Sequence, residues 1–352
     1  MNIGVVGTGF VARRAHIPAW AAIPGARITA LCNVHPESLE AAGREVPSAA
    51  LFSDYHALFE CEGDSSVDAI SVCTSNAAHY PIVLAALEAG KHVLCEKPLG
   101  ISVAEIRALG AAADARGLVL MAQHQLRFAE PAHAARACVA AGRVGEVHHA
   151  RVRALRRDRV PTLPGFTDRE LSGGGAVLDL GVHALDMALW LMGFPQPVRV
   201  SGSVRTNFAH GDGIRGHWGE WDRTRFTVED FGTGFVHFEN GATLSLECAW
   251  LGHYGEEGLS CELFGEKGNL NWPSGEFVSQ GKALTREMLM ATTDVQNDGD
   301  AHSKAIRAFY EAVTNGTASP VSWREASISL SIIEAIYASA REGREVILEP
   351  AP

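Results

Sequence analysis

The chain has 352 residues, 47% of them hydrophobic, and a formal net charge of −11. This length and apolar content allow two domains, each with a sizeable core. The negative charge disfavours a nucleic-acid partner, because phosphate backbones attract basic surfaces.

The first third of the chain alternates strands with helices. The expected strands are 2–6, 27–32, 67–73, 93–95 and 119–122, and the expected helices start at 7–12 and cover 36–44, 78–89 and 102–116. Ser102 and Glu105 have the spacing of a capping box. Strand–helix repeats with short connections predict a parallel sheet covered on both faces. We therefore expect an α/β domain over residues 1–122.

The remaining residues, 123–352, predict an α+β domain with a mostly antiparallel sheet. The expected helices are 131–141, 173–192, 301–313 and 323–341, and the expected strands are 146–155, 198–204, 231–238, 243–249 and 259–264. Asn240-Gly241 is a hairpin signal between two of these strands. Residues 205–229 and 279–300 show little periodicity and are expected to be long loops, which are often functional. Candidates to line a pocket are Trp218, Trp221, Asp222 and His302.

The apolar stretch 173–192 is interrupted by three ionisable side chains. Because it is otherwise hydrophobic on every side, it predicts a buried helix. Asp179, His183 and Asp186 are spaced by four and three residues, so they share one stripe of that helix. Ionisable groups are rarely buried without partners or a function. The stripe is therefore either one wall of a polar site or a structural pairing of histidine and aspartate.

A glycine motif, Gly7-Thr8-Gly9-Phe10-Val11-Ala12, follows the first strand and opens a helix. In such a G-x-G-x-x-A turn the glycines permit close backbone approach, and the helix N-terminus offers N–H groups to a pyrophosphate. Its position on the first strand–helix turn predicts a dinucleotide site.

The second expected strand ends in Cys32-Asn33-Val34-His35, without the acidic residue that usually binds the ribose 2′-hydroxyl. Asn33 can hydrogen-bond a hydroxyl and does not repel a 2′-phosphate. Arg13 and Arg14 lie just beyond the glycine turn and are either phosphate ligands or ordinary surface residues. The cofactor is thus expected to be NAD or NADP, with NAD preferred.

Glu96-Lys97-Pro98 stands at the carboxyl end of strand 93–95, where ligands bind in open α/β sheets. A lysine in that place can hold a substrate hydroxyl and loses a proton readily when desolvated. The alternative is a surface Glu–Lys pair before a turn proline.

The N-terminus, MNIGVVGTGF, has no basic n-region or cleavage pattern, and the sequence shows no apolar run that we expect to span a bilayer. Seven cysteines, odd in number and never spaced as CxxC, predict buried free thiols. We expect a cytoplasmic protein with no membrane partner, no disulfide framework and no zinc knuckle.

Four segments together resemble the Gfo/Idh/MocA oxidoreductases, which include glucose–fructose oxidoreductase and inositol dehydrogenases. They are GTGFVA at 7–12, CTSNAAHY at 73–80, AGKHVLCEKPLG at 89–100 and SGGGAVLDLGVHALDMALWLMG at 172–193, and the likeness keeps the family's order from residue 1 to about 270. The resemblance implies a Rossmann domain followed by an α+β domain with a large open sheet. It also implies NAD(P)-dependent hydride transfer at a secondary alcohol or carbonyl of a sugar, sugar derivative or cyclitol, and a homodimer or homotetramer formed through the C-terminal sheet.

Position by position, the family's E-K-P lysine falls on Lys97 and its D-x-x-x-H pair on Asp179 and His183. In the loop after the third strand, Ser75 replaces the family's proline, and Asn33 replaces its second-strand aspartate. The implied cofactor-binding residues are Gly7, Thr8, Gly9, Phe10, Val11, Asn33, Thr74, Asn76, His79, Glu96 and Lys97. The implied substrate residues are Lys97, Arg127, Asp179 and His183.

These residues suggest a mechanism. His183 titrates in the right range to act as general acid and base, and Asp179 would orient its ring or bind a neighbouring hydroxyl. Lys97 would hydrogen-bond the reacting oxygen and stabilise charge as it develops. The cofactor supplies the chemistry and the protein the placement.

Three alternatives come from other classes. The chain can be a NAD-dependent glycosidase that works by oxidation and elimination, which product analysis with an aryl glycoside would detect. It can be a NAD(P)-sensing regulator without turnover, although such a protein has no need of Lys97, Asp179 and His183 together. Asp179 and His183 can also bind a divalent ion, but no third ligand is spaced to join them, so no metal is expected.

Overall fold

The computed structural model describes residues 1–211, 214, 216–219, 221–281, 283–289 and 299–349. The chain forms two compact units, Met1–Gln125 with Gly299–Ser327, and Leu126–Asp298 with Ile328–Pro352. The segment Gly299–Ser327, which the sequence analysis assigns to the second domain, therefore packs with the first unit. A domain boundary between residues 122 and 123 stays a prediction.

A six-stranded parallel sheet forms the centre of the first unit. Its order is β3-β2-β1-β4-β5-β6. The strands are β1 (Asn2–Val6), β2 (Arg27–Cys32), β3 (Ala50–Phe52), β4 (Ala69–Val72), β5 (His92–Glu96) and β6 (Leu120–Gln123). This is the strand order of a doubly wound dinucleotide-binding fold, and its ligands bind beyond the strand carboxyl ends where the order reverses, between β1 and β4.

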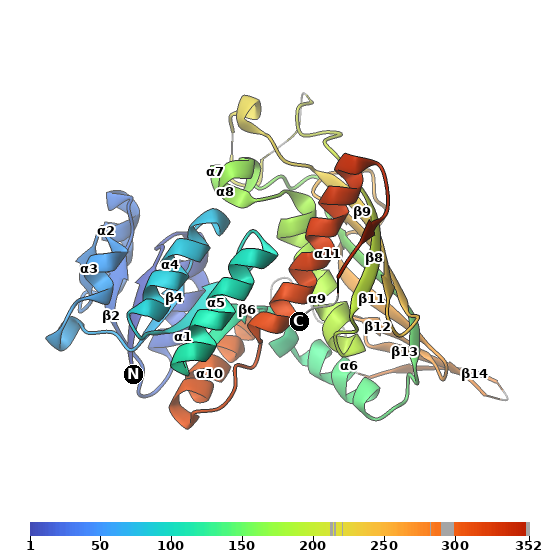
Figure 1. Ribbon diagram of the computed structural model, residues 1–352, viewed down its shortest axis with the longest axis horizontal. Coiled ribbons are helices and arrows are strands. Elements are labelled where there is room, and N and C mark those ends of the chain that lie inside the picture. Colours follow the sequence, from blue (N-terminus) through green and yellow to red (C-terminus); the bar gives the residue numbers. More distant parts are fainter. Residues whose placement is uncertain (212–213, 215, 220, 282, 290–298, 350–352) are drawn as a thin grey trace. The chain divides into compact units, whose positions relative to one another are not determined.

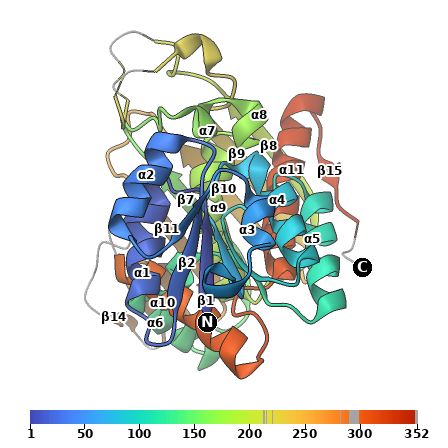
Figure 2. The same ribbon diagram turned by 90° about the vertical axis from the view of Figure 1, so that its left-hand side faces the viewer.

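Helices cover both faces of this sheet, as the uninterrupted apolar strands require. The helices of this unit are η1 (Ala12–His16), α1 (Ile17–Ala21), α2 (Pro36–Glu45), α3 (Tyr55–Phe59), η2 (Gly63–Ser65), α4 (Asn76–Glu88), α5 (Val103–Arg116) and α10 (Gly299–Asn315). The short η3 (Gln125–Phe128) spans the point in the sequence where the second unit begins. Figure 2 shows α4 and α5 on one face and α1 and α10 on the other. The expected cap of α5 is present, since the Ser102 hydroxyl accepts the N–H of Glu105.

The second unit contains a nine-stranded sheet in the order β14-β13-β12-β11-β7-β10-β9-β8-β15. The strands are β7 (Val147–Leu155), β8 (Pro197–Arg205), β9 (Phe231–Phe238), β10 (Thr243–Ala249), β11 (Gly258–Gly265), β12 (Asn269–Trp272), β13 (Glu276–Gln280), β14 (Leu284–Met288) and β15 (Val346–Ile347). β7 and β10 run parallel, and the other neighbours are antiparallel. The predicted mostly antiparallel sheet is confirmed, and Asn240-Gly241 makes the β9–β10 hairpin with Gly241 at φ 84°.

The helices of the second unit lie on one side of this sheet (Figure 1). They are α6 (Glu130–Ala140), α7 (Pro164–Thr167), α8 (Arg169–Ser172), η4 (Val177–Gly181), α9 (Val182–Met192), η5 (Arg223–Arg225) and α11 (Trp323–Glu342). α11 approaches the sheet closely at Gly202 and Gly234, where an added Cβ would lie 2.8 and 2.5 Å from Ile336. Glycine is needed there because the helix occupies the space of a side chain.

Several strands were not expected from the sequence. β3, β12, β13, β14 and β15 are additional, and β14 lies inside the stretch 279–300 that we expected to be a loop; residues 290–298 of that stretch are outside the described residues. All five residues of β14 are exposed, so no apolar alternation marks the strand.

The expectation that no apolar run is long enough for a bilayer also needs correction. Arg169–Met192 meets the length and composition test, but 78% of its most apolar window is buried in the protein. A helix that is buried in this way forms part of a protein core.

Candidate functional site

The glycine turn has the backbone shape that a dinucleotide requires. Gly7 adopts φ 87°, and a Cβ there would lie 2.6 Å from the carbonyl oxygen of Cys73. The ideal Cβ position of Gly9, in contrast, has no heavy atom within 4 Å, so its backbone faces open space. The helical segment that follows begins beside this turn, which supplies N–H groups for a pyrophosphate. The turn therefore fits a dinucleotide phosphate on geometry as well as on sequence.

Asn33, at the end of β2, is held by residues of the same turn. Its Nδ2 donates to the hydroxyls of Thr8 at 2.9 Å and Ser38 at 3.2 Å, and its Oδ1 accepts the N–H of His35. The side chain is thus fixed between the glycine turn and α2. Nearby, the guanidinium of Arg13 is paired with Glu45. Cofactor binding by Asn33 stays a prediction.

Thr74 lies in the loop after β4, and Asn76 is the first residue of α4. His79, one turn into α4, is fully buried. Its Nδ1 lies 2.7 Å from the carbonyl oxygen of Pro98, and its Nε2 lies 3.2 Å from that of Thr74. Burial lowers the pKa of His79, and these hydrogen bonds offset part of the effect. His79 therefore contacts both the loop that follows β4 and the loop that follows β5.

Glu96 ends β5 and directly precedes Lys97. Its Oε1 accepts a hydrogen bond from Nε2 of the fully buried His16 at 2.8 Å, and its Oε2 accepts the backbone N–H of Lys97 at 3.3 Å. Burial by itself raises the pKa of Glu96, but the hydrogen bond from His16 and the interactions with His16, His302 and Lys97 bring it down to about 2. Glu96 is therefore an ionised carboxylate at neutral pH, and Lys97 directly follows this hydrogen-bonded, charged residue.

The polar stripe of the second unit divides into two parts. Between Ala176 and Leu191, only Asp179, His183 and Trp190 are partly exposed, whereas Asp186 is 2% exposed. The expectation that all three ionisable residues share one polar wall therefore needs correction. Asp179 and His183 are partly exposed, whereas Asp186 is buried and pairs with the Arg127 guanidinium.

A single π turn, η4, carries Asp179, and α9 carries His183. Oδ2 of Asp179 accepts a hydrogen bond from the indole N–H of the fully buried Trp250 at 3.1 Å. Nδ1 of His183 is buried. Single π turns inside helices are frequent at functional sites.

The glycines before η4 are explained by Glu229 and Tyr337. An added Cβ at Gly174 would lie 2.2 Å from the Tyr337 hydroxyl, and one at Gly175 would lie 1.9 Å from the Glu229 carbonyl oxygen. The Glu229 carboxylate accepts the N–H groups of Gly175 and Val177 and the Tyr337 hydroxyl. Burial raises its pKa. This carboxylate fixes the start of the segment that carries Asp179.

Arg127 is buried and forms a two-pronged ion pair. Its Nε lies 2.8 Å from Oδ2 of Asp186 and its Nη2 lies 2.7 Å from Oδ1. The guanidinium also stacks over Phe194, 5.0 Å from the ring centre. These contacts give Arg127 a structural role in the second unit, and substrate binding by Arg127 stays a prediction.

The long-loop residues lie in different places. Trp218 stacks on Phe166 at 5.5 Å, and Asp222 caps η5. His302 belongs to α10 in the first unit, with its ring 6.4 Å from that of His16. A pocket-lining role for these residues and for Trp221 stays a prediction.

Five residues that support these sites were not predicted from the sequence: His16, Ser71, Trp250, Glu229 and Tyr337. Each of them acts through partners far away in sequence, and none stands in a recognisable motif. The glycine triplet was the one sequence signal that other groups approach the backbone closely just before η4. Among the described residues, no group of three or more histidine, cysteine, aspartate or glutamate side chains could hold a metal ion.

Comparison with known proteins agrees with this geometry. Residues 1–124 match the family described as "Oxidoreductase family, NAD-binding Rossmann fold", and residues 132–271 match the Gfo/Idh/MocA C-terminal domain. These matches first define the class, a nicotinamide-dependent oxidoreductase with a Rossmann fold. The chain belongs to the Gfo/Idh/MocA family, and it is an NAD-binding enzyme.

Named relatives align along almost the whole chain. D-glucoside 3-dehydrogenase of Escherichia coli is 29% identical over 99% of this chain and 97% of its own length. Myo-inositol 2-dehydrogenase of Thermotoga maritima is 27% identical over 99% of both chains. The crystal structure of an aldose-aldose oxidoreductase from Caulobacter crescentus, complexed with glycerol, superimposes with a TM-score of 0.79 at 26% identity over 99% of both chains.

Proposed function

We propose that this enzyme transfers hydride between NAD and a secondary alcohol or carbonyl carbon of a sugar, sugar derivative or cyclitol. The observation that carries the proposal is the pairing of Asp179 and His183 as partly exposed polar groups on an otherwise buried helix. The relatives named for glucosides and myo-inositol support the substrate class.

A nicotinamide bound by these residues would supply the hydride chemistry, as acceptor in oxidation and as donor in reduction. In oxidation, His183 takes the hydroxyl proton at Nε2, since its Nδ1 is buried. Asp179, held by Trp250, orients the ring or a neighbouring hydroxyl. Lys97 donates a hydrogen bond to the reacting oxygen and stabilises the charge that develops there. The cofactor-binding assignments to Gly7, Thr8, Gly9, Phe10, Val11, Asn33, Thr74, Asn76 and His79 belong to this proposal.

Substrate and cofactor are tested together by a screen of sugars and cyclitols with NAD and NADP, followed at the absorbance of reduced nicotinamide. We expect turnover with NAD, and a fall of orders of magnitude in kcat for Lys97→Met. Lys91→Met is the matched control, because Lys91 lies just before β5 and Lys97 just after it. Turnover that survives Lys97→Met would refute the assignment, and release of phenol from an aryl glycoside would point to a glycosidase.

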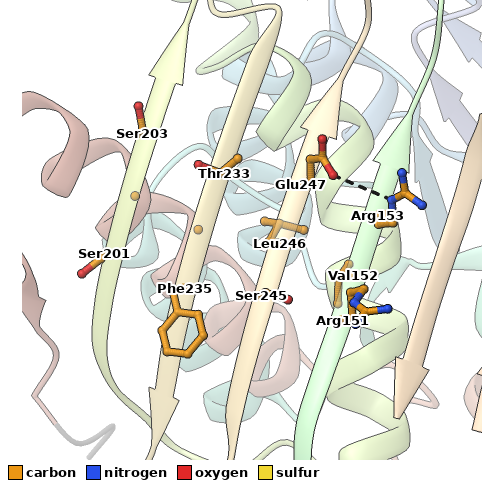
Figure 3. A pocket seen from close by; sticks show the side chains of 12 residues that line it. Arg151, Val152, Arg153, Ser201, Ser203, Thr233, Phe235, Ser245, Leu246 and Glu247 are labelled. Atoms are coloured by element: carbon orange, nitrogen blue, oxygen red, sulfur yellow. Dashed lines mark ion pairs between the residues drawn. The ribbon is translucent and has the colours of Figure 1, made fainter. Parts of the chain in front are cut away.

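We also propose that copies of this chain associate through the outer face of the nine-stranded sheet. Figure 3 shows a shallow depression across β7, β8, β9 and β10, about 780 Å³ in volume. Charged and small polar side chains line most of it, and Phe235 projects from it, 41% exposed. An exposed aromatic side chain on a broad sheet face favours contact with another protein surface.

Association is tested by light scattering after size-exclusion chromatography. We expect an oligomer for the natural chain and a smaller species for Phe235→Glu. Leu51→Glu, which changes a side chain 46% exposed in the first unit, is the control and should leave the mass unchanged. A monomeric natural chain would overturn this proposal. We further propose a cytoplasmic location, which the seven free thiols support.

A further inference from the structure

A chain of buried hydrogen bonds runs from α1 through β4 to the backbone of Lys97. It begins at Trp20, whose indole N–H donates to the Ser71 hydroxyl at 3.2 Å. Ser71 Oγ lies 2.7 Å from Nδ1 of His16, and Nε2 of His16 lies 2.8 Å from Oε1 of Glu96. Trp20, Ser71 and His16 are each 0% exposed. Burial of polar groups costs free energy unless they are hydrogen-bonded, and every member of this chain is hydrogen-bonded to the next.

The donors and acceptors in this chain match without conflict. An ionised carboxylate only accepts, so Nε2 of His16 carries the hydrogen that Glu96 receives. An indole N–H only donates, so the Ser71 oxygen accepts it and can turn its own hydrogen towards Nδ1 of His16. The imidazole is therefore held at both nitrogens, and its ring cannot rotate without breaking two hydrogen bonds.

Resting on the function proposed above, we propose that His16 is a positioning residue for Lys97. His16 fixes the Glu96 carboxylate, whose second oxygen accepts the Lys97 N–H, so the lysine leaves β5 in one direction. His79 holds the next residue, since its Nδ1 lies 2.7 Å from the Pro98 carbonyl oxygen. The Lys97 peptide is thus held on both sides by buried histidines.

The electrostatics agree with this role. Burial raises the pKa of Glu96, and its neighbours, with His16 first among them, lower it to about 2. Without His16 the carboxylate would keep its burial and lose its strongest partner. It would then move towards water or bind a proton, and its hold on the Lys97 backbone would weaken.

The experiment compares His16→Leu and Ser71→Ala with a control, His92→Gln. His92 belongs to β5 as well, but at the opposite end from Lys97, where Nδ1 accepts the N–H of Val119. We expect kcat to fall about 100-fold in His16→Leu, because a small misplacement of a catalytic group has an effect of this size. KM and the Kd of NADH, measured by fluorescence titration, should change less than about 3-fold. Ser71→Ala should show the same pattern at smaller amplitude, and it serves if His16→Leu does not fold.

The deciding measurement is a double-mutant cycle with Lys97→Met. If His16 acts through Lys97, then His16→Leu, or Ser71→Ala in its place, should lower kcat by less than about 3-fold in the Lys97→Met background. An equal fall in both backgrounds would overturn the inference and leave a purely structural histidine. An unchanged kcat in both His16→Leu and Ser71→Ala would overturn it too. Full turnover by Lys97→Met alone would instead refute the proposed function, so the two failures are distinguishable.

Discussion

The buried pair of Arg127 and Asp186 separates a structural role from a substrate role. Both side chains are almost fully buried, 3% and 2% exposed, and two short hydrogen bonds join them. Removal of one partner leaves an uncompensated buried charge, which costs about 3–5 kcal/mol of stability. Replacement of both by apolar residues of similar size is often close to neutral.

Three variants measure the free-energy cost of breaking the Arg127–Asp186 pair. Asp186→Leu and Arg127→Met should each lower the free energy of unfolding by about 3–5 kcal/mol, and the double variant by much less than their sum. The assay is urea denaturation followed by circular dichroism. Arg225→Met is the control, because that guanidinium is 59% exposed and paired with Asp168, so its loss should cost less than about 1 kcal/mol.

Activity completes the test. In the folded fraction of Arg127→Met, kcat and KM should stay within about 3-fold of the natural enzyme if the arginine supports only the fold. A KM raised by orders of magnitude with unchanged stability would refute this reasoning. That result would assign Arg127 to the substrate, as the family resemblance predicts.

Three further predictions concern His183, Asn33 and Glu96. His183→Asn should lower kcat of alcohol oxidation by about 10²- to 10⁴-fold and flatten the acidic limb of its pH profile. His133→Asn, a change at an exposed histidine, should alter neither kcat nor the pH profile. If His183→Asn leaves the pH profile unaltered and lowers the melting temperature, His183 is a structural histidine. Asn33→Asp should raise the ratio of kcat/KM for NAD over NADP, and an unchanged ratio would show that residue 33 does not face the ribose. The pKa of Glu96 lies near 2 instead of 4.5, so its contribution to stability, about 3 kcal/mol, is present above pH 4.5 and lost as pH falls towards 2. Glu96→Gln should flatten the acid side of the curve of stability against pH, and a curve of unchanged slope would contradict the depressed pKa.

The strands that are buried on one or both faces were predicted well. β1, β2, β9 and β10 have the bounds that the sequence predicts, because their side chains are buried on one or both faces. The short edge strands could not be predicted. β3 has three residues and β15 has two, and β14 is exposed along its whole length, so packing leaves no pattern in their sequences.

The candidate site shows the same division. Lys97, Asp179 and His183 stand in motifs whose position relative to a strand or helix can be read from the sequence. His16 does not, because its partners Ser71 and Glu96 lie 55 and 80 residues away. Asp186 was misplaced because the sequence does not show that Arg127, 59 residues away, pairs with it in the interior.

The return of Gly299–Ser327 to the first unit affects how the protein is made. The ribosome completes Met1–Gln125 and then synthesises roughly 170 further residues before α10 emerges. At about 5–20 residues per second this interval lasts on the order of 10 to 35 s. During it, β5 and β6 lack the helix that covers them, and Trp20 lacks Phe309, its edge-to-face partner at 6.1 Å. A gene fragment that ends after β6 should therefore yield an aggregation-prone product, whereas a circular permutant that begins at Gly299 would deliver α10 to the nascent sheet without delay.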